Sequence, residues 1–240
     1  NYNILEFQQI SNSFNEMTVR IETLIKEVYE TQLLVKEARL QYLQAQINPH
    51  FMFNVLTMIA IKVKKHRDEE LYQTVTSFAG LMRGKLFRRN EVEIKLKEEM
   101  EIAGFYLYLQ SERFKDIITY NIEWESDEIK ECYVPRLCIE PIVENAVIHG
   151  LEPKGTEGRI RVAIREASED SINIVVEDDG VGFNVNEMDD RKDNKNPRVG
   201  VMNIQRLIRN LYGDKYGVLF QSEIGKGTIV TVCLPMRKDR

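Results

Sequence analysis

The sequence contains no apolar run long enough to cross a lipid bilayer, which needs roughly 20 such residues. Its longest apolar stretch, residues 134–148, is interrupted by proline, arginine and glutamate. Neither a secretory signal peptide nor an initiator methionine stands at the N-terminus. We therefore expect the chain to be a fragment of a longer protein.

Cysteine is scarce, and the net charge is not positive. The three cysteines, Cys132, Cys138 and Cys233, form no C-x-x-C pair and no cysteine–histidine spacing. This argues against a structural zinc site, and free thiols suit a reducing cytoplasm. The net charge of −5 argues against nucleic acid as the main partner. With 43% hydrophobic and 30% charged residues among 240, the sequence predicts a soluble protein of one or two domains.

The two common nucleotide-binding loops are also missing. Gly225, Lys226 and Gly227 resemble the end of a P-loop, but Phe220 stands where its leading glycine is needed. Gly180 and Gly182 lack the third glycine of a Rossmann turn. Any nucleotide site must therefore be of another kind.

The first 115 residues contain one proline and few glycines, and their apolar residues recur at helical spacing. A heptad seam, which favours a partner helix, is formed by Ile10, Phe14, Met17, Ile21, Leu24 and Val28. The seam then continues in a different frame through Leu33, Leu40, Leu43 and Ile47. Two interpretations stay open: a tolerated irregularity, or a place where helix rotation is transmitted.

Two further helices are predicted in this region. Residues 69–88 carry the apolar stripe Leu71, Val75, Phe78 and Met82, and residues 96–114 carry a second stripe. The polar segment 66–70 between helices suits the turn of an antiparallel hairpin. Core packing is the simplest interpretation of each stripe residue.

From residue 117 onward the pattern becomes α/β. Alternating apolar residues predict strands at 118–124, 160–164 and 172–176, with shorter strands at 218–220 and 229–234. Helices are predicted at 135–149, with Pro135 in the first turn, and at 199–211. The polar segment 184–197 is predicted to be a mobile loop.

Several polar and glycine motifs follow one another on these elements. Glu144, Asn145 and His149 lie on a predicted helix; Asp178, Gly180 and Gly182 end a strand; Gly200, Asn203 and Arg206 open a helix; Gly227 and Thr228 precede the last strand. This order resembles the ATP-binding domain shared by histidine kinases, Hsp90, type II topoisomerases and MutL.

The resemblance implies a role for each of these residues. Asp178 accepts a hydrogen bond from the adenine amino group, while Gly180 and Gly182 allow the backbone to approach the base. Asn145 offers oxygen to Mg²⁺, and Gly200 leaves helix N–H groups for phosphate. The implied nucleotide-binding set is Asn145, His149, Asp178, Gly180, Gly182, Gly200, Asn203, Arg206, Gly227 and Thr228. His149 has two open interpretations, a surface side chain or a contact to phosphate or ribose.

Residues 44–54 read QAQINPHFMFN, with His50 directly after Pro49. A proline inside a helix costs about 3 kcal/mol and can bend it, which would alter how His50 is presented. The stretch resembles the phosphoacceptor motif of LytS/YesM-like sensor histidine kinases, close to Q-x-Q-I-x-P-H-F-L-F-N, with Met52 as the departure. His66, in the charged turn, is interpreted as a solvated residue.

Two further segments extend the resemblance. Residues 135–150 resemble the nucleotide helix of the same kinases, with Glu140 in place of their usual glutamine. Residues 6–24 resemble the last helix of a HAMP linker. A HAMP remnant implies an upstream transmembrane helix, so the full protein is expected in the cell membrane with this fragment on its cytoplasmic side.

The expected fold class combines α and α/β parts. A HAMP helix and coiled-coil linker spans 1–27, a dimerising phosphoacceptor hairpin spans 28–90, a connecting helix spans 91–116, and an α/β sandwich of the Hsp90/histidine kinase type spans 117–240. Two hairpins should form a four-helix bundle, so a homodimer is expected.

The resemblance implies a protein histidine kinase that binds ATP and Mg²⁺. His50 is phosphorylated by ATP, and the phosphoryl group passes to an aspartate of a response regulator. Glu144 is a candidate general base, because Phe51 follows the histidine. Two alternatives stay open: a phosphorylation-dead ATP-binding dimer module, and an ATPase clamp of the same superfamily.

Arg198 departs from the expected pattern, because these kinases have glycine there. A glycine allows a turn with positive φ, which arginine resists by about 1 kcal/mol. Arg198 is either a solvated residue or a charge near the polyphosphate. Residues 184–197 occupy the position of the superfamily's ATP lid.

Overall fold

A computed structural model of the 240-residue chain describes isolated residues between 17 and 35, and the ranges 49–86, 91–115, 117–168, 170–184 and 197–238. For residues 49–51 and 197–199 it describes the backbone alone. The chain divides into two compact units, Asn1–Pro49 and His50–Arg240, which are described separately.

In the first unit the described residues are helical. Met17, Ile21, Leu24 and Val28 of the predicted seam are each 44–59% exposed. Their apolar surface is not buried within one copy of the chain. The other predicted seam positions, Ile10, Phe14, Leu33, Leu40, Leu43 and Ile47, lie outside the described residues.

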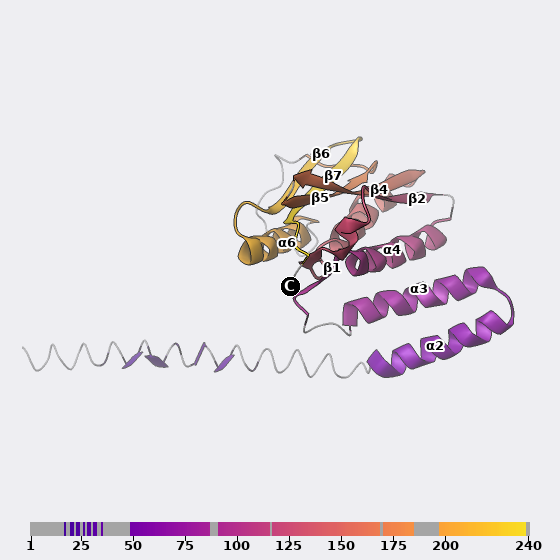
Figure 1. The fold of residues 1–240 in the computed structure, drawn as a ribbon, viewed down its shortest axis with the longest axis horizontal. Coiled ribbons are helices and arrows are strands. Elements are labelled where there is room, and N and C mark those ends of the chain that lie inside the picture. Colours follow the sequence, from indigo (N-terminus) through magenta and orange to yellow (C-terminus); the bar gives the residue numbers. More distant parts are fainter. Residues whose placement is uncertain are drawn as a thin grey trace, which may run out of the picture. The chain divides into compact units, whose positions relative to one another are not determined.

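The second unit begins with the predicted hairpin (Figure 1). Helix α2 (Pro49–Lys65) is joined to helix α3 (Glu69–Leu86) by a turn in which Arg67 has a φ of 58°. The Asp68 carboxylate accepts the N–H of Leu71 at 3.0 Å and caps α3. The last residue described in α3, Leu86, lies close to the predicted end at residue 88. The bend expected at Pro49 stays a prediction, because the residues before it lie outside the described ranges.

A second contact closes the open end of the hairpin. The Arg83 guanidinium lies 3.9 Å from the ring centroid of Phe53, a cation–π geometry. The start of α2, with His50, therefore lies beside the last turns of α3.

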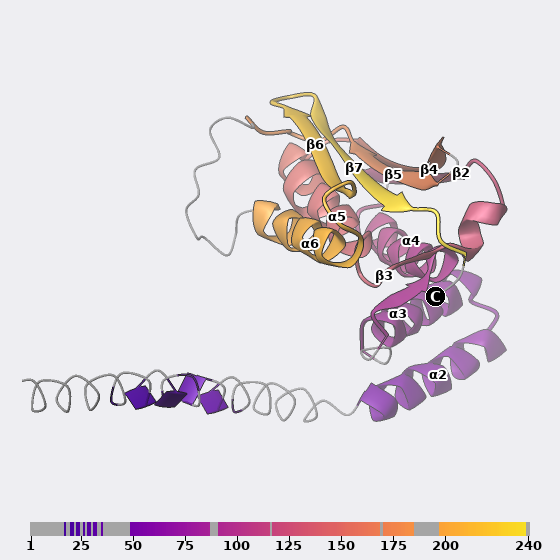
Figure 2. The same ribbon diagram turned by 60° about the vertical axis from the view of Figure 1, so that its left-hand side comes forward.

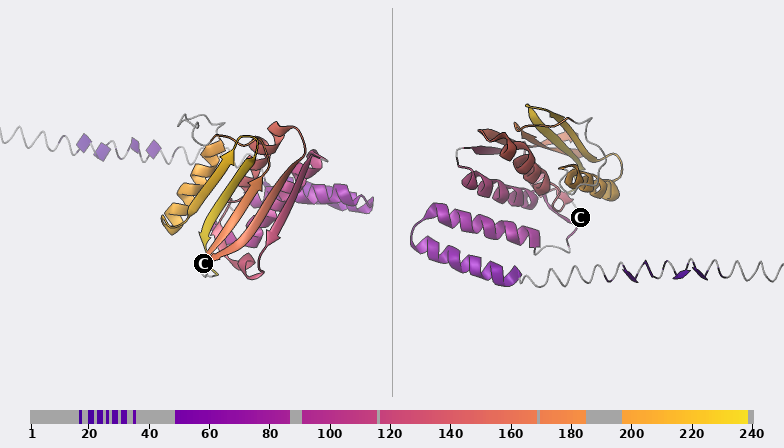
Figure 3. Two further views of the ribbon diagram at one scale, coloured as in Figure 1. Left: turned by 90° about the horizontal axis from the view of Figure 1, so that it is seen from above. Right: turned by 180° about the vertical axis from the view of Figure 1, so that it is seen from behind.

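A five-stranded sheet forms one layer of the α/β sandwich (Figure 3). Its order is β2-β4-β5-β7-β6, with β2 and β4 parallel and the other pairs antiparallel. The strands are β2 (Ile118–Trp124), β4 (Gly158–Ser168), β5 (Ser171–Asp178), β6 (Gly217–Glu223) and β7 (Gly227–Pro235). All five predicted strands are confirmed. They could be predicted because period-2 alternation is a local signal for a strand in a sheet with one buried face.

Helices cover one face of this sheet (Figure 2). They are α4 (Leu96–Arg113), α5 (Glu140–Asn145) with the π-helix η2 (Ala146–Leu151), and α6 (Pro197–Tyr212). Short helices η1 (Glu128–Glu131) and η3 (Glu152–Lys154) complete the layer's connections. One continuous core joins α4 to the sheet, with fully buried Leu107, Ile164 and Ile174 among its members. The helix expected as a connector, α4, is thus packed into the sandwich.

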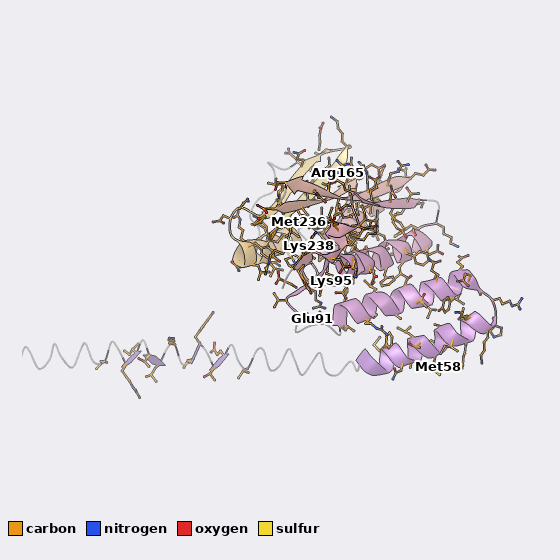
Figure 4. All side chains as sticks on the ribbon, viewed as in Figure 1. Met58, Glu91, Lys95, Arg165, Met236 and Lys238 are labelled. Carbon is orange, nitrogen blue, oxygen red and sulfur yellow. The ribbon has the colours of Figure 1, made fainter. Side chains whose placement is uncertain are left out.

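Helix α3 lies on the other side of α4, so the second unit has the order sheet, helices, hairpin. Figure 4 shows Arg165 at the sheet and Met58 on α2 at opposite sides of this unit. Among the described residues, no helix combines the length and apolar composition that a bilayer-crossing helix requires.

The helix predicted at 135–149 is partly wrong. Pro135 ends the strand β3 (Tyr133–Pro135), which pairs with β1 (Glu93–Lys95), and α5 begins only at Glu140. Leu137 has a φ of 55°, which no regular helix allows. Pro141, rather than Pro135, is the proline of the first helical turn.

The predicted helix at 199–211 is confirmed as α6, which extends from Pro197 to Tyr212. Arg198 has helical backbone there, so this position does not form a turn with positive φ. Whether its charge lies near the polyphosphate stays a prediction. Residues 185–196, most of the predicted lid, lie outside the described residues. The lid therefore stays a prediction.

Candidate functional site

A cleft that is open to solvent lies between the sheet and helices α5, η2 and α6. Its wall is mostly apolar, and the residues that line it are Ile142, Asn145, Ala146, His149, Gly150, Val176, Asp178, Gly182, Phe183, Val201, Met202, Phe220, Thr228 and Val230. Five of the predicted nucleotide-binding residues are among them: Asn145, His149, Asp178, Gly182 and Thr228.

Asp178 supplies the buried charge of the cleft. It ends β5 and is 6% exposed. Its Oδ1 accepts the N–H of Gly180 at 2.9 Å, and the backbone N–H of Thr228 also donates to the carboxylate. Burial raises the pKa of Asp178 to about 6 in spite of these two donors. At neutral pH the cleft therefore contains a carboxylate held in place by the backbone.

Close backbone contacts require glycine around this carboxylate. A β-carbon built on Gly150 would lie 2.6 Å from Asp178 Oδ1, and one on Gly180 would lie 2.5 Å from the Cα of Gly150. The N–H of Val181 donates to the Gly150 carbonyl at 3.0 Å. The first turn after β5 is thus pressed against η2.

Gly182 and Gly227 have positive φ values of 59° and 100°. A β-carbon on Gly182 would overlap the carbonyl of Glu223, and one on Gly227 would overlap the carbonyl of Asp178. Both glycines are required for the close contact between the turn after β5 and the β6–β7 turn.

Helix α5 passes directly into the π-helix η2, a widened turn that is frequent at functional sites. Asn145 ends α5, and a β-carbon built on Gly200 of α6 would lie 3.4 Å from Asn145 Nδ2. His149 lies on η2 with its side chain exposed at the cleft. The two predicted polar helices therefore meet at Asn145 and Gly200.

Some predicted site residues are not brought to the cleft wall. Asn203 and Arg206 are on the exposed side of α6. Glu144 is 38% exposed and lies 3.7 Å from Lys85 Nζ of α3, outside the lining residues. His50 is in the first turn of α2, and its side chain is not among the described ones.

The apolar wall was missed by the sequence analysis. Phe183 and Phe220, whose ring centroids are 6.3 Å apart, line the cleft together with Met202. Met202 is 45% exposed. Gly150 was also missed as a site residue. Chain position could have indicated Phe183, directly after the glycine turn, and Met202, between Gly200 and Asn203.

The donors of the cleft fit Mg²⁺ only together with a phosphate ligand. Among the residues that the structure describes, no group of three or more His, Cys, Asp or Glu side chains could hold a metal ion. Asn145 lines the cleft, and its side chain has an amide oxygen. One protein ligand with phosphates and water is a common arrangement for Mg²⁺, so the residues fit the ion as a partner of a bound nucleotide.

Two family models match the chain. Residues 38–118 match the family described as histidine kinase, and residues 135–238 match the histidine kinase-, DNA gyrase B- and HSP90-like ATPase. Sensor histidine kinase YesM of Bacillus subtilis is 32% identical over 236 residues, which are 98% of this chain and 40% of YesM. This chain belongs to the LytS/YesM-type sensor histidine kinases. The second match assigns residues 135–238, most of the sandwich, to this ATPase family.

Other relatives agree with this family. Sensor protein LytS of Oceanobacillus iheyensis is 29% identical to the kinase over 220 residues, 88% of this chain and 37% of LytS. The chain thus spans about 40% of the length of these curated relatives. Among solved structures, the histidine kinase domain of the Erythrobacter litoralis EL346 blue-light activated histidine kinase aligns with TM-score 0.45 and 18% identity, over 73% of this chain and 84% of that chain.

Proposed function

We propose that this histidine kinase binds Mg-ATP in the cleft and phosphorylates its own His50. The observation that carries the proposal is the buried Asp178 carboxylate at the end of β5, in a cleft lined by apolar side chains. Such a carboxylate is a strong hydrogen-bond acceptor for an exocyclic amino group, and the apolar wall suits a flat base.

The ligand contacts follow from this placement. Adenine lies in the apolar part of the cleft and donates its amino group to Asp178. Gly180, Gly182 and Gly227 keep side chains away from the base. His149 and Thr228 contact ribose or phosphate at the cleft wall. The polyphosphate is bound from α6 by Gly200, Asn203 and Arg206. Asn145 holds Mg²⁺, which neutralises phosphate charge when it is bound.

In the proposed reaction a nitrogen of the His50 imidazole attacks the γ-phosphorus. A nitrogen–phosphorus bond forms, the oxygen–phosphorus bond to ADP breaks, and the imidazole loses its proton. An imidazole with an ordinary pKa near 6.5 is largely neutral at pH 7, so its lone pair is available. Catalysis then depends mainly on positioning and on charge neutralisation.

Glu144 remains the candidate base for that proton. Its contact with Lys85 at 3.7 Å is loose, and its 38% exposure leaves room for a second partner. Lys85 lies closer to Glu140, at 2.7 Å. An approaching imidazole therefore replaces only the contact between Lys85 and Glu144, and the ion pair between Lys85 and Glu140 is kept.

The wider assembly is proposed from the same resemblance. Two copies pair through the hairpin and the N-terminal seam, because the exposed Ile21 and Leu24 side chains favour burial against a second helix. A HAMP linker over residues 1–27 and a membrane-spanning segment precede the hairpin in the full protein, which places this region on the cytoplasmic side. The phosphoryl group passes from His50 to an aspartate of a response regulator.

Incubation of the chain with ATP labelled at the γ-phosphate tests this function. We expect acid-labile, base-stable label on the protein, lost in His50→Gln and kept in the matched control His66→Gln, whose histidine lies in the exposed turn after α2. Mg-ATP affinity should stay within a few-fold in both variants. Released phosphate without label indicates an ATPase clamp, and bound nucleotide with neither indicates a phosphorylation-dead module.

A further inference from the structure

The segment Arg136–Glu140 joins three helices that are far apart in the sequence. The Arg136 Nη2 donates to the carbonyls of Gly84 and Lys85, at 2.8 and 2.7 Å. These are carbonyls of the last turn of α3 as the structure describes it, and the last four carbonyls of a helix have no intrahelical partner. Arg136 therefore caps the end of the phosphoacceptor hairpin from within the ATP-binding sandwich.

The side of the segment that faces α4 is held by a buried carboxylate. Glu99, which is fully buried, accepts the N–H of Leu137 and the N–H of Ile139, both at 2.9 Å. These bonds hold Leu137 in its positive-φ conformation and set where α5 begins. The start of α5 is therefore fixed to α4 by hydrogen bonds to a buried group, a costly arrangement to disturb.

The third connection is an ion pair between α3 and α5. Lys85 Nζ lies 2.7 Å from Oε1 of Glu140, which is 2% exposed, and 3.7 Å from Glu144. Burial opposes the charge on Lys85, yet the two carboxylates raise its pKa overall. Because Glu140 is buried, the loss of its partner leaves an uncompensated charge.

The face of α3 behind this ion pair is built for close contact with α4. A β-carbon on Gly84 would lie 2.5 Å from Cγ1 of Ile102, and one on Gly80 would overlap the ring of Phe105. The opposite face of α3 leaves Leu71 and Phe78 exposed. Helix α3 is thus seated on the sandwich along one face, while the other is available to the bundle.

Helix α5 connects the ion pair with Lys85 to the cleft. Glu140 begins the helix and Asn145 ends it, so a displacement at Glu140 moves Asn145 as well. At the hairpin, the turn that carries Lys85 lies close to Arg83, which covers Phe53 near the start of α2. The start of α2 and the Asn145 end of the cleft are therefore linked through Lys85 and Glu140.

We propose that Lys85 and Arg136 are positioning residues that couple the phosphoacceptor hairpin to the Asn145 end of the ATP cleft. This coupling rests on the proposed function: the two residues keep the hairpin that contains His50 in a fixed position relative to the ATP cleft. Neither residue is among those that line the cleft. Since coupling between sites is reciprocal, nucleotide bound at Asn145 also stabilises the contact between α3 and the sandwich.

Charge reversal at the ion pair tests the coupling. We expect Lys85→Glu to lower the labelling rate of His50 at saturating ATP at least tenfold, while the Kd for Mg-ATP changes less than threefold. The double variant Lys85→Glu with Glu140→Lys should restore at least half of the rate. The matched control is Lys97→Glu. Lys97 is an exposed lysine of α4 that pairs with Glu131 at 2.6 Å, and we expect His50 of this variant to be labelled as fast as in the unmodified chain.

Three results would overturn the proposal: an unchanged rate in Lys85→Glu, an equal loss in Lys97→Glu, or a double variant no better than the single one. Thermal melting shows whether Lys85→Glu has a folding defect. If it has, the labelling rate of the double variant tests the proposal, because that variant keeps one positive and one negative charge at the ion pair.

Hydrogen exchange of the α3 amides separates failure of this proposal from failure of the proposed function. We expect a non-hydrolysable Mg-ATP analogue to slow exchange at residues 83–86 several-fold in the unmodified chain and not in Lys85→Glu. If His50 is never labelled but this protection appears, the coupling stands and the kinase reaction fails. Equal exchange with and without nucleotide in the unmodified chain refutes the coupling.

Discussion

Gly150 lies directly against the carboxylate of Asp178: a β-carbon built on Gly150 would lie 2.6 Å from Oδ1. The same Oδ1 accepts the Gly180 N–H at 2.9 Å, so it has little freedom to move aside. Gly150→Ala should therefore displace the carboxylate and weaken ATP binding by about 10- to 100-fold, the range of one charged hydrogen bond. Isothermal titration calorimetry measures the effect.

Gly104→Ala is the matched control for that substitution. Gly104 lies within α4, and its β-carbon would meet Ile122 Cδ1 at an ordinary 3.8 Å. Alanine there should raise the free energy of unfolding by about 0.5–1 kcal/mol and leave ATP affinity unchanged. If Gly150→Ala binds ATP as tightly as Gly104→Ala does, the contact with Asp178 has no part in binding.

Asp178 should make ATP binding depend on pH. Its pKa of about 6 is raised by burial, and a bound amino group stabilises the ionised form, so ATP should lower that pKa. Affinity should then fall as the pH drops below about 6, by up to tenfold per unit.

The comparison for this pH dependence is Asp178→Asn, because ATP phosphates titrate in the same range in both proteins. The variant should bind about 1–3 kcal/mol more weakly at pH 7.5 and show a shallower decline toward pH 5. Parallel curves for the two proteins would mean that Asp178 does not contact the base.

Asn145→Ala should remove the contribution of Mg²⁺ while sparing the base contact. The side chain lines the cleft next to Gly200. Titrations with ADP in the presence and absence of Mg²⁺ measure both terms. We expect similar affinity without the ion and a loss of most of the gain that Mg²⁺ gives the unmodified chain. A full magnesium gain in the variant argues against Asn145 as a ligand.

The exposed seam of the first unit should hold two chains together. Ile21 and Leu24 are 49% and 44% exposed, and glutamates in their place would be buried unpaired at a helix interface, which is strongly unfavourable. Sedimentation equilibrium should give a dimer for the unmodified chain and a markedly higher dissociation constant for Ile21→Glu with Leu24→Glu. Lys26→Glu, off the seam on the same helix, is the control. A monomer for the unmodified chain at micromolar concentration contradicts the dimer.

Local patterns carried much of the prediction. The alternation of Ile172, Ile174 and Val176 placed β5, and the residues after it placed Asp178 at a strand end, because strand periodicity and turn chemistry depend on neighbouring residues alone. The helical spacing before residue 115 likewise predicted α3 and α4. The motif around His50 led to the family, although the structure describes no side chain at that position.

Other features were decided only by tertiary structure. Gly150 is a site residue because η2 and the turn after β5 meet there, 28 residues or more apart in sequence. The start of α5 was misplaced because the periodicity of residues 135–149 contains no sign of Glu99, the buried group on α4 that receives the Leu137 and Ile139 N–H groups. A sequence determines which side chains can cap, pair or pack, but partners distant in the chain are chosen only when burial brings them together, since burial is what makes an unpaired charge or a misplaced β-carbon costly.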